Sequence, residues 1–117
     1  MNYAHKAAQY AQFATKIKGA RIGAIAVRGQ NVFPAWNSRT THPKQAHFAR
    51  NPFCIHLHAE IAAMVRAKWD ADALYVVRIG AAGEFRNAKP CEGCMRALTN
   101  VRKICYSTGI GQEIAEA

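Results

Sequence analysis

Two short motifs, His58-Ala59-Glu60 and Pro90-Cys91-Glu92-Gly93-Cys94, constrain the fold of this chain more than any other feature of its sequence. The imidazole of His58 and the thiols of Cys91 and Cys94 are ligand types that Zn²⁺ prefers in proteins. They can bind one ion only if the fold brings together two segments that are far apart along the chain. The sequence therefore predicts that the segments beginning at the two motifs start side by side.

The number of ligands in this predicted zinc site favours a catalytic role. Three protein ligands leave the fourth tetrahedral position open for water, and zinc-bound water has a pKa near ~7. Glu60 follows His58 closely and could transfer the protons of that water. A structural zinc site with a fourth ligand from His42, Cys54 or His56 is the alternative, but such a site needs no adjacent proton carrier. The latter two residues could also contribute to a second metal site.

Hydrophobic periodicity and turn residues predict an alternation of helices and strands. Helices are expected over residues 3–18, 59–68 and 91–101, and strands over residues 21–28, 32–36, 73–79 and 103–108, with a short last strand within residues 112–117. This order predicts an α/β fold with a central mixed sheet of four to five strands flanked by helices. The unit over residues 73–108 is expected to be a right-handed parallel crossover.

Three details refine this prediction. Pro34 in the second strand indicates a sheet edge or a bulge, because proline cannot donate a ladder hydrogen bond. Residues 80–89 are expected to form a turn-rich connection. The short Gly109-Ile110-Gly111 turn predicts that the last two strands form an antiparallel hairpin.

The length of 117 residues suits one domain spanning residues 1–117, and half of the residues are hydrophobic, which predicts a packed core. No apolar stretch approaches the ~20 residues that span a bilayer, and no signal-peptide pattern opens the chain. We therefore expect a soluble, cytoplasmic protein. The four cysteines could form two disulfides, but the metal-ligand spacing of Cys91 and Cys94 and the absence of a secretion signal argue against this.

The charge of the chain points to an anionic ligand. Sixteen lysines and arginines against seven acidic residues give a formal net charge of +9. Such a surface attracts nucleotide phosphates or a nucleic-acid backbone, although it also serves to keep a small protein in solution. Charge alone does not distinguish a free nucleotide from a polymer.

Together the two motifs resemble the hallmark of the cytidine deaminase superfamily, which pairs (H/C)-A-E with P-C-x-x-C. The match includes Pro90, and the expected order of elements covers nearly the whole chain. The resemblance implies a three-layer fold and a zinc-dependent hydrolase in which His58, Cys91 and Cys94 bind the metal and Glu60 is the catalytic proton carrier. Histidine at position 58 is similar to the deoxycytidylate, RNA-editing and tRNA-adenosine branches, whereas an antiparallel last hairpin resembles the free-cytidine branch.

The same resemblance implies two substrate contacts. Family members commonly carry an asparagine at the position of Asn37 that binds the sugar, and the backbone N–H at the position of Ala59 faces the base carbonyl. Judged as a residue type alone, Asn37 could instead cap a turn. In the loop that follows, Arg39 and Lys44 either contact a phosphate group or are simply solvated.

From these observations we expect hydrolytic deamination of a free cytosine nucleoside or nucleotide, with deoxycytidylate as the preferred substrate, to give the uracil counterpart and ammonia. The alternative is a polynucleotide deaminase that acts on tRNA adenosine or on cytosine in single-stranded nucleic acid, which the net charge supports. A third reading is a zinc-stabilised binding module without catalytic activity. By resemblance to the family we also expect a homo-oligomer, and no membrane partner.

Overall fold

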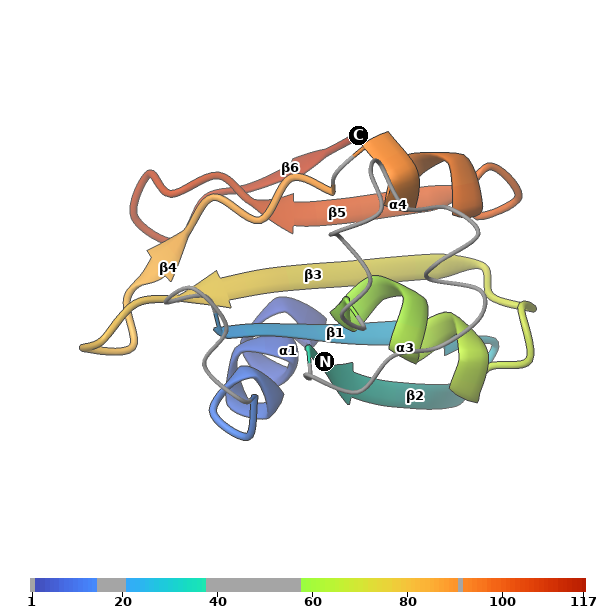
Figure 1. Cartoon of the computed structure of the whole chain (residues 1–117), viewed down its shortest axis with the longest axis horizontal. Helices are drawn as coiled ribbons and strands as arrows, with labels where there is room; N and C mark the ends of the chain where they lie inside the picture. The colour runs from blue at the N-terminus through green and yellow to red at the C-terminus, as the bar shows by residue number, and fades with distance from the viewer. Residues whose placement is uncertain (1, 15–20, 38–57, 91) are drawn as a thin grey trace.

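The fold is described here from a computed structural model over residues 2–14, 21–37, 58–90 and 92–117. The elements in chain order are α1 (Tyr3–Ala11), β1 (Arg21–Arg28), β2 (Asn31–Trp36), α3 (Ala59–Arg66), β3 (Ala73–Ile79), β4 (Phe85–Arg86), α4 (Glu92–Ala97), β5 (Lys103–Ser107) and β6 (Ile114–Glu116). Every predicted helix and strand is present (Figure 1). The helices are shorter than expected, and the part of the first predicted helix over residues 15–18 lies outside the described residues.

The strands form one mixed sheet in the order β2-β1-β3-β5-β6, with β4 paired to β3. β1 is antiparallel to both β2 and β3, whereas β3 and β5 are parallel, which confirms the predicted parallel pairing across the 73–108 unit. β5 and β6 are antiparallel, as the Gly109-Ile110-Gly111 turn predicted. The expected number of four to five strands was too low, because the described part of the chain already forms a sheet of six. The additional strand, β4, has two residues, which is too short for a readable period-two pattern.

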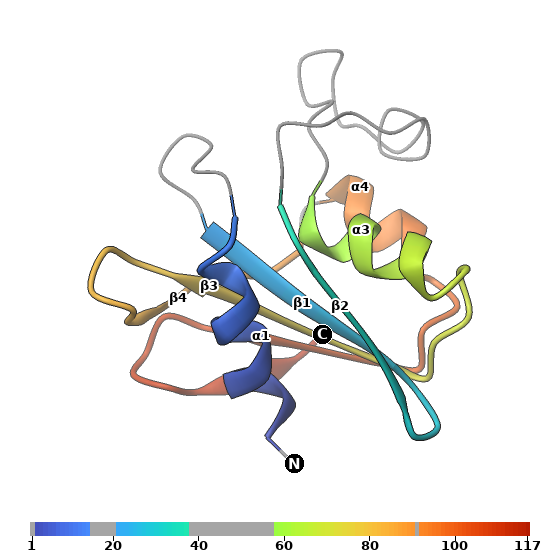
Figure 2. The same ribbon diagram turned by 90° about the horizontal axis from the view of Figure 1, so that it is seen from below.

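Helices cover both faces of this sheet, so the three-layer architecture is confirmed. α1 lies on one face, and α3 and α4 lie on the other (Figure 2). A hydrophobic core lies on each face of the sheet, and the side chains of β3 point alternately into the two cores. Leu74 and Val76 pack beneath α3, whereas Val77 and Ile79 pack beneath α1. None of the helices in the described part of the chain is long and apolar enough to cross a membrane.

α1 lies against the sheet at backbone distance. Its buried residues are all alanines, Ala4, Ala7 and Ala11, and the strand residue beneath them is Gly23. A Cβ atom built on Gly23 would lie 1.9 Å from the carbonyl oxygen of Ala7 and 2.6 Å from the backbone nitrogen of Ala11. Small residues on both sides therefore allow this close packing, which fixes α1 over the start of β1.

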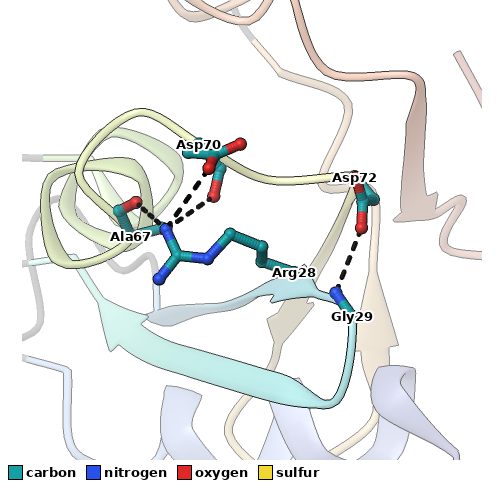
Figure 3. Close-up of polar contacts among 5 residues, drawn as sticks. All are labelled: Arg28, Gly29, Ala67, Asp70 and Asp72. Carbon is teal, nitrogen blue, oxygen red and sulfur yellow. Dashed lines mark hydrogen bonds and ion pairs between the residues drawn. The ribbon is translucent and has the colours of Figure 1, made fainter.

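Polar contacts hold the far end of α3 to the turn between β1 and β2 (Figure 3). The guanidinium of Arg28 donates to the carbonyl oxygen of Ala67 at 3.1 Å and lies 3.6 Å from the carboxylate of Asp70. The carboxylate of Asp72 accepts a hydrogen bond of 3.1 Å from the backbone N–H of Gly29. These contacts fix the position of α3 against the sheet, and the same helix begins next to His58.

β2 is an edge strand, which agrees with the expectation for Pro34. Asn37 donates its backbone N–H to the carbonyl oxygen of Ile22 at 3.1 Å, so these opposed residues form a hydrogen-bonded pair. Because bonded and non-bonded pairs alternate along an antiparallel ladder, the pair of Ile25 and Pro34 is a non-bonded one. The nitrogen of Pro34 therefore faces the open side of the sheet.

α3 ends in a left-handed turn without glycine. Lys68 and Trp69 have φ values of 55° and 62°. Their backbone N–H groups donate to the carbonyl oxygens of Val65 at 3.1 Å and Met64 at 2.8 Å, the bonding pattern of a Schellman motif. Lys68 occupies the position in this motif where glycine is preferred, because a Cβ atom is unfavourable in the left-handed conformation.

Replacing Lys68 with glycine is expected to raise the free energy of unfolding by about 0.5–1 kcal/mol, because the relief of backbone conflict exceeds the extra entropy of the unfolded chain. Urea denaturation measures the change. Lys68→Ala is the matched control, since it removes the same side chain but keeps Cβ, and it should give no stabilisation. Equal stabilisation of both variants would assign the effect to the lysine side chain and contradict the backbone explanation.

Candidate metal centre

The structure brings two of the three predicted zinc ligands together. His58 is the N-cap residue of α3, yet its side chain does not cap the helix, and its Nδ1 atom lies 3.3 Å from the Sγ atom of Cys94. Cys94 lies in the first turn of α4 and is fully buried. The third predicted ligand, Cys91, lies outside the described residues. The starts of the two motif segments therefore meet, as their chemistry required.

The separation of the two donor atoms fits a shared zinc ion. Zn–N and Zn–S bonds of about 2.0–2.1 and 2.3 Å at a tetrahedral angle place nitrogen and sulfur about 3.6 Å apart. The observed 3.3 Å is close to this value. Of the cysteines that the structure describes, Cys94 and Cys105, neither is in a disulfide. Cys105 is buried in β5, and that burial raises the pKa of its thiol, as suits a core residue rather than a ligand.

The predicted proton carrier, Glu60, is buried in the same helix start as His58. The residue is only 4% exposed and lies in the first turn of α3, two positions after His58. Carboxylates are seldom buried to this extent, and a buried ionisable group next to a metal site is a candidate for catalysis. The N-terminal end of the helix favours negative charge, which suits a carboxylate at this position.

The structure gives Asn37 a structural role, which is separate from the predicted sugar contact. It is 5% exposed, and its Oδ1 atom accepts a hydrogen bond of 2.9 Å from the backbone N–H of Ile22. The side chain thus continues the pairing of β1 and β2 beyond the last strand residue. Ala59 is fully buried at the first position of α3, where backbone N–H groups have no acceptor within the helix. Asn37 lies beside the start of β1, and Ala59 directly follows His58 at the start of α3.

Several predicted residues cannot be placed. The phosphate candidates and the residues considered for a fourth ligand or a second metal site fall outside the described part of the chain; they are Arg39, His42, Lys44, Cys54 and His56.

The sequence patterns did not single out Arg78 and Arg86, which face each other across β3 and β4. The signal that could have revealed them is the register of β4, because only that pairing places the two arginines opposite each other. α3 and α4 run against the direction of β3 and β5, so the first turn of each helix is the one nearer to the carboxyl ends of these strands (Figure 1). In open α/β sheets, ligands bind at that end of the strands.

Comparison with known proteins agrees with this geometry. The family model for the cytidine and deoxycytidylate deaminase zinc-binding region matches residues 1–108. None of the curated protein sequences matches the chain.

Solved structures share the fold at low sequence identity. The cytidine deaminase from Burkholderia pseudomallei is similar with a TM-score of 0.71 and 16% identity, over 98% of this chain and 88% of that one. The cytidine deaminase from Mycobacterium leprae gives a TM-score of 0.60 and 15% identity, over 97% and 89% of the two chains. The dCMP deaminase from the cyanophage S-TIM5 gives 0.58 and 21%, over 92% and 81%.

Proposed function

The chain belongs to the cytidine and deoxycytidylate deaminase zinc-binding family, and from this premise we propose that its substrate is a free cytosine nucleoside or nucleotide, with deoxycytidylate preferred. The family match confirms the predicted superfamily, the hydrolytic deaminase class and the dependence on Zn²⁺. The proposed reaction consumes one water molecule, replaces the exocyclic amine of the cytosine ring with oxygen, and releases ammonia. The observation that carries the proposal is the 3.3 Å approach of His58 Nδ1 to Cys94 Sγ, with Glu60 buried two positions after His58.

In this proposal His58, Cys91 and Cys94 hold the metal. When bound, zinc would make a water molecule acidic enough to react near neutral pH. Glu60 would take a proton from the attacking water and deliver it to the ring nitrogen next to the amine-bearing carbon. The carboxylate would then take the remaining proton from the added hydroxyl group and deliver it to the amine, which leaves as ammonia. Its burial supports this role, because proton transfer is more efficient where bulk water does not compete.

We assign substrate positioning to Asn37 and Ala59. The Oδ1 atom of Asn37 is held by the N–H of Ile22, which fixes the orientation of the amide group. The Nδ2 atom would donate to a sugar hydroxyl, since an amide group carries two N–H donors. The backbone N–H of Ala59, in the first turn of α3, would donate to the carbonyl oxygen of the base.

An unphosphorylated cytosine nucleoside is the second candidate substrate. The observation that favours it is the antiparallel pairing of β5 and β6, an arrangement that resembles the free-cytidine branch of the family. Histidine at position 58 is instead similar to the deoxycytidylate branch. A cytoplasmic location and self-association remain predictions, and light scattering tests the second.

An ammonia-release assay tests the proposed function. We expect the zinc-loaded protein to deaminate deoxycytidylate faster than deoxycytidine or cytidine, and to lose activity when a chelator removes the metal. Adenosine compounds, short RNA and single-stranded DNA complete the panel. Activity confined to the polymers, with binding that weakens by several powers of ten between low and high salt, would replace the proposal with polynucleotide deamination.

A further inference from the structure

Four residues lie in one row across the sheet near the carboxyl end of β3. Asn37 is bonded to Ile22, which is opposite Arg78 in the pairing of β1 with β3. Arg78 is in turn opposite Arg86 in the pairing of β3 with β4. The residue proposed to bind the sugar and two cationic residues are therefore aligned across neighbouring strands.

The two arginines project from the face of the sheet that carries the metal centre. Directly opposed residues of an antiparallel pair share a face, and residues two apart along a strand also do so. Ile22, which is opposite Arg78, and Val76, two residues before it, both pack in the core beneath α3. The first turns of α3 and α4 are the ends of these helices nearer to the carboxyl end of β3 (Figure 1). His58 and Cys94 belong to those helix starts, and Arg78 is the second-last residue of β3, so the arginines lie on the same face and toward the same end of the sheet as the metal centre.

The pairing of these arginines is unfavourable without an anion. Like charges directly opposite each other destabilise a sheet. Arg86 is partly compensated, because its Nη2 atom lies 3.2 Å from the carboxylate of Glu84, whereas within the described ranges the guanidinium of Arg78 forms no ion pair. Backbone N–H groups of Glu84 and Ala82, together with Arg86, hold the pKa of the Glu84 carboxyl below its usual value, so this carboxylate stays charged and orients Arg86.

We propose that Arg78, assisted by Arg86, binds the 5′-phosphate of a cytosine nucleotide whose sugar is held by Asn37. Guanidinium groups bind phosphate oxygens in pairs, with charge-assisted hydrogen bonds. Neighbouring strands are about 4.8 Å apart, so Arg78 lies about 10 Å from Asn37 across the row. An arginine side chain and a sugar phosphate together span such a distance. The inference rests on the proposed function and deepens it, because it assigns the residues that would select a nucleotide over a nucleoside.

Arg78→Gln tests the proposal through the ratio of kcat/KM for deoxycytidylate to kcat/KM for deoxycytidine. We expect this ratio to fall by about 10- to 100-fold, the range for a lost hydrogen bond between charged groups. Arg78→Lys keeps the charge but not the paired donors, so its ratio should lie between those of the wild type and Arg78→Gln. Arg86→Gln should lower the ratio less, because Glu84 already engages that side chain.

Arg102→Gln is the matched control. Arg102 is exposed and immediately precedes β5, at the opposite end of the strands, and the substitution removes the same charge. In Arg102→Gln the ratio of kcat/KM for deoxycytidylate to kcat/KM for deoxycytidine should remain within about twofold of the wild-type ratio, since an exposed charge at that distance is screened by salt. An unchanged ratio in Arg78→Gln, or an equal loss on both substrates, would overturn the phosphate assignment while leaving the proposed function intact.

If no cytosine compound is deaminated, calorimetric titration tests the phosphate subsite independently of the proposed deaminase function. The proposed function then fails, and the subsite is judged by binding of deoxycytidylate and deoxycytidine to the zinc-loaded protein. Binding of deoxycytidylate at least tenfold tighter than deoxycytidine, with the difference lost in Arg78→Gln, supports the subsite. Equal affinity for the two compounds overturns it. If Arg78→Gln does not fold, Arg78→Lys and Arg86→Gln are measured in the same way.

Discussion

Replacing Glu60 with glutamine is expected to lower kcat by about 10²- to 10⁴-fold, the usual contribution of a general acid–base group, while zinc and the fold are retained. Glutamine has nearly the shape of glutamate but cannot accept or release the proton of the attacking water. Glu60 is 4% exposed, so bulk water has little access to replace it as a proton carrier. Steady-state ammonia release and metal analysis of the purified variant measure the two parts of this prediction.

Glu116→Gln provides the control for this variant, because it makes the same chemical change at an exposed position in β6. It should leave turnover unchanged. Appreciable activity in Glu60→Gln would contradict the proposed mechanism and favour the reading of the zinc site as structural. Loss of zinc together with activity would instead assign Glu60 to metal retention.

Gly23→Ala is expected to destabilise the protein by about 3 kcal/mol, at the upper end of the range for overpacking. The new methyl group would fall 1.9 Å from the carbonyl oxygen of Ala7 and 2.6 Å from the nitrogen of Ala11. Both atoms belong to the backbone of α1, so no side-chain rotation relieves the overlap and the helix must move. In a chain of this size the melting temperature should fall by about 10 °C or more, as measured by circular dichroism.

A substitution at a second glycine serves as the control, because it measures the cost of an unfavourable backbone conformation without a steric overlap. Gly83 has a φ of 81°, but a Cβ atom built there meets nothing within 4 Å. Gly83→Ala should therefore show only the cost of a left-handed alanine, about 1 kcal/mol. If Gly23→Ala costs no more than Gly83→Ala, α1 can shift freely and does not have a fixed position on the sheet.

The parallel pairing of β3 with β5 and the approach of His58 to Cys94 were predictable for different reasons. β3 is an apolar run that only Arg78 interrupts, and a helix lies between β3 and β5 along the chain, which is the kind of connection that joins parallel strands. The last hairpin followed from its turn, in which Gly109 adopts a φ of 91°. The approach of His58 to Cys94 followed from ligand chemistry, because both donors are needed at one ion.

Features that depend on register were not predictable. β4 is only two residues long, so nothing in its composition indicates that Arg86 lies opposite Arg78. Similarly, the residue type of Asn37 suggests either a substrate contact or a cap, but only the fold shows that its side-chain oxygen accepts from Ile22. Such pairings are set by tertiary contacts that local sequence patterns do not contain.

The orientation of Pro34 also protects the protein against aggregation. An exposed edge strand normally presents a regular row of donors and acceptors, to which the strand of another molecule can add. The nitrogen of Pro34 faces the open side of β2 and carries no hydrogen, so the row is interrupted near its middle. A continuous intermolecular sheet cannot extend from this edge, and copies of the chain that associate here must do so through their side chains.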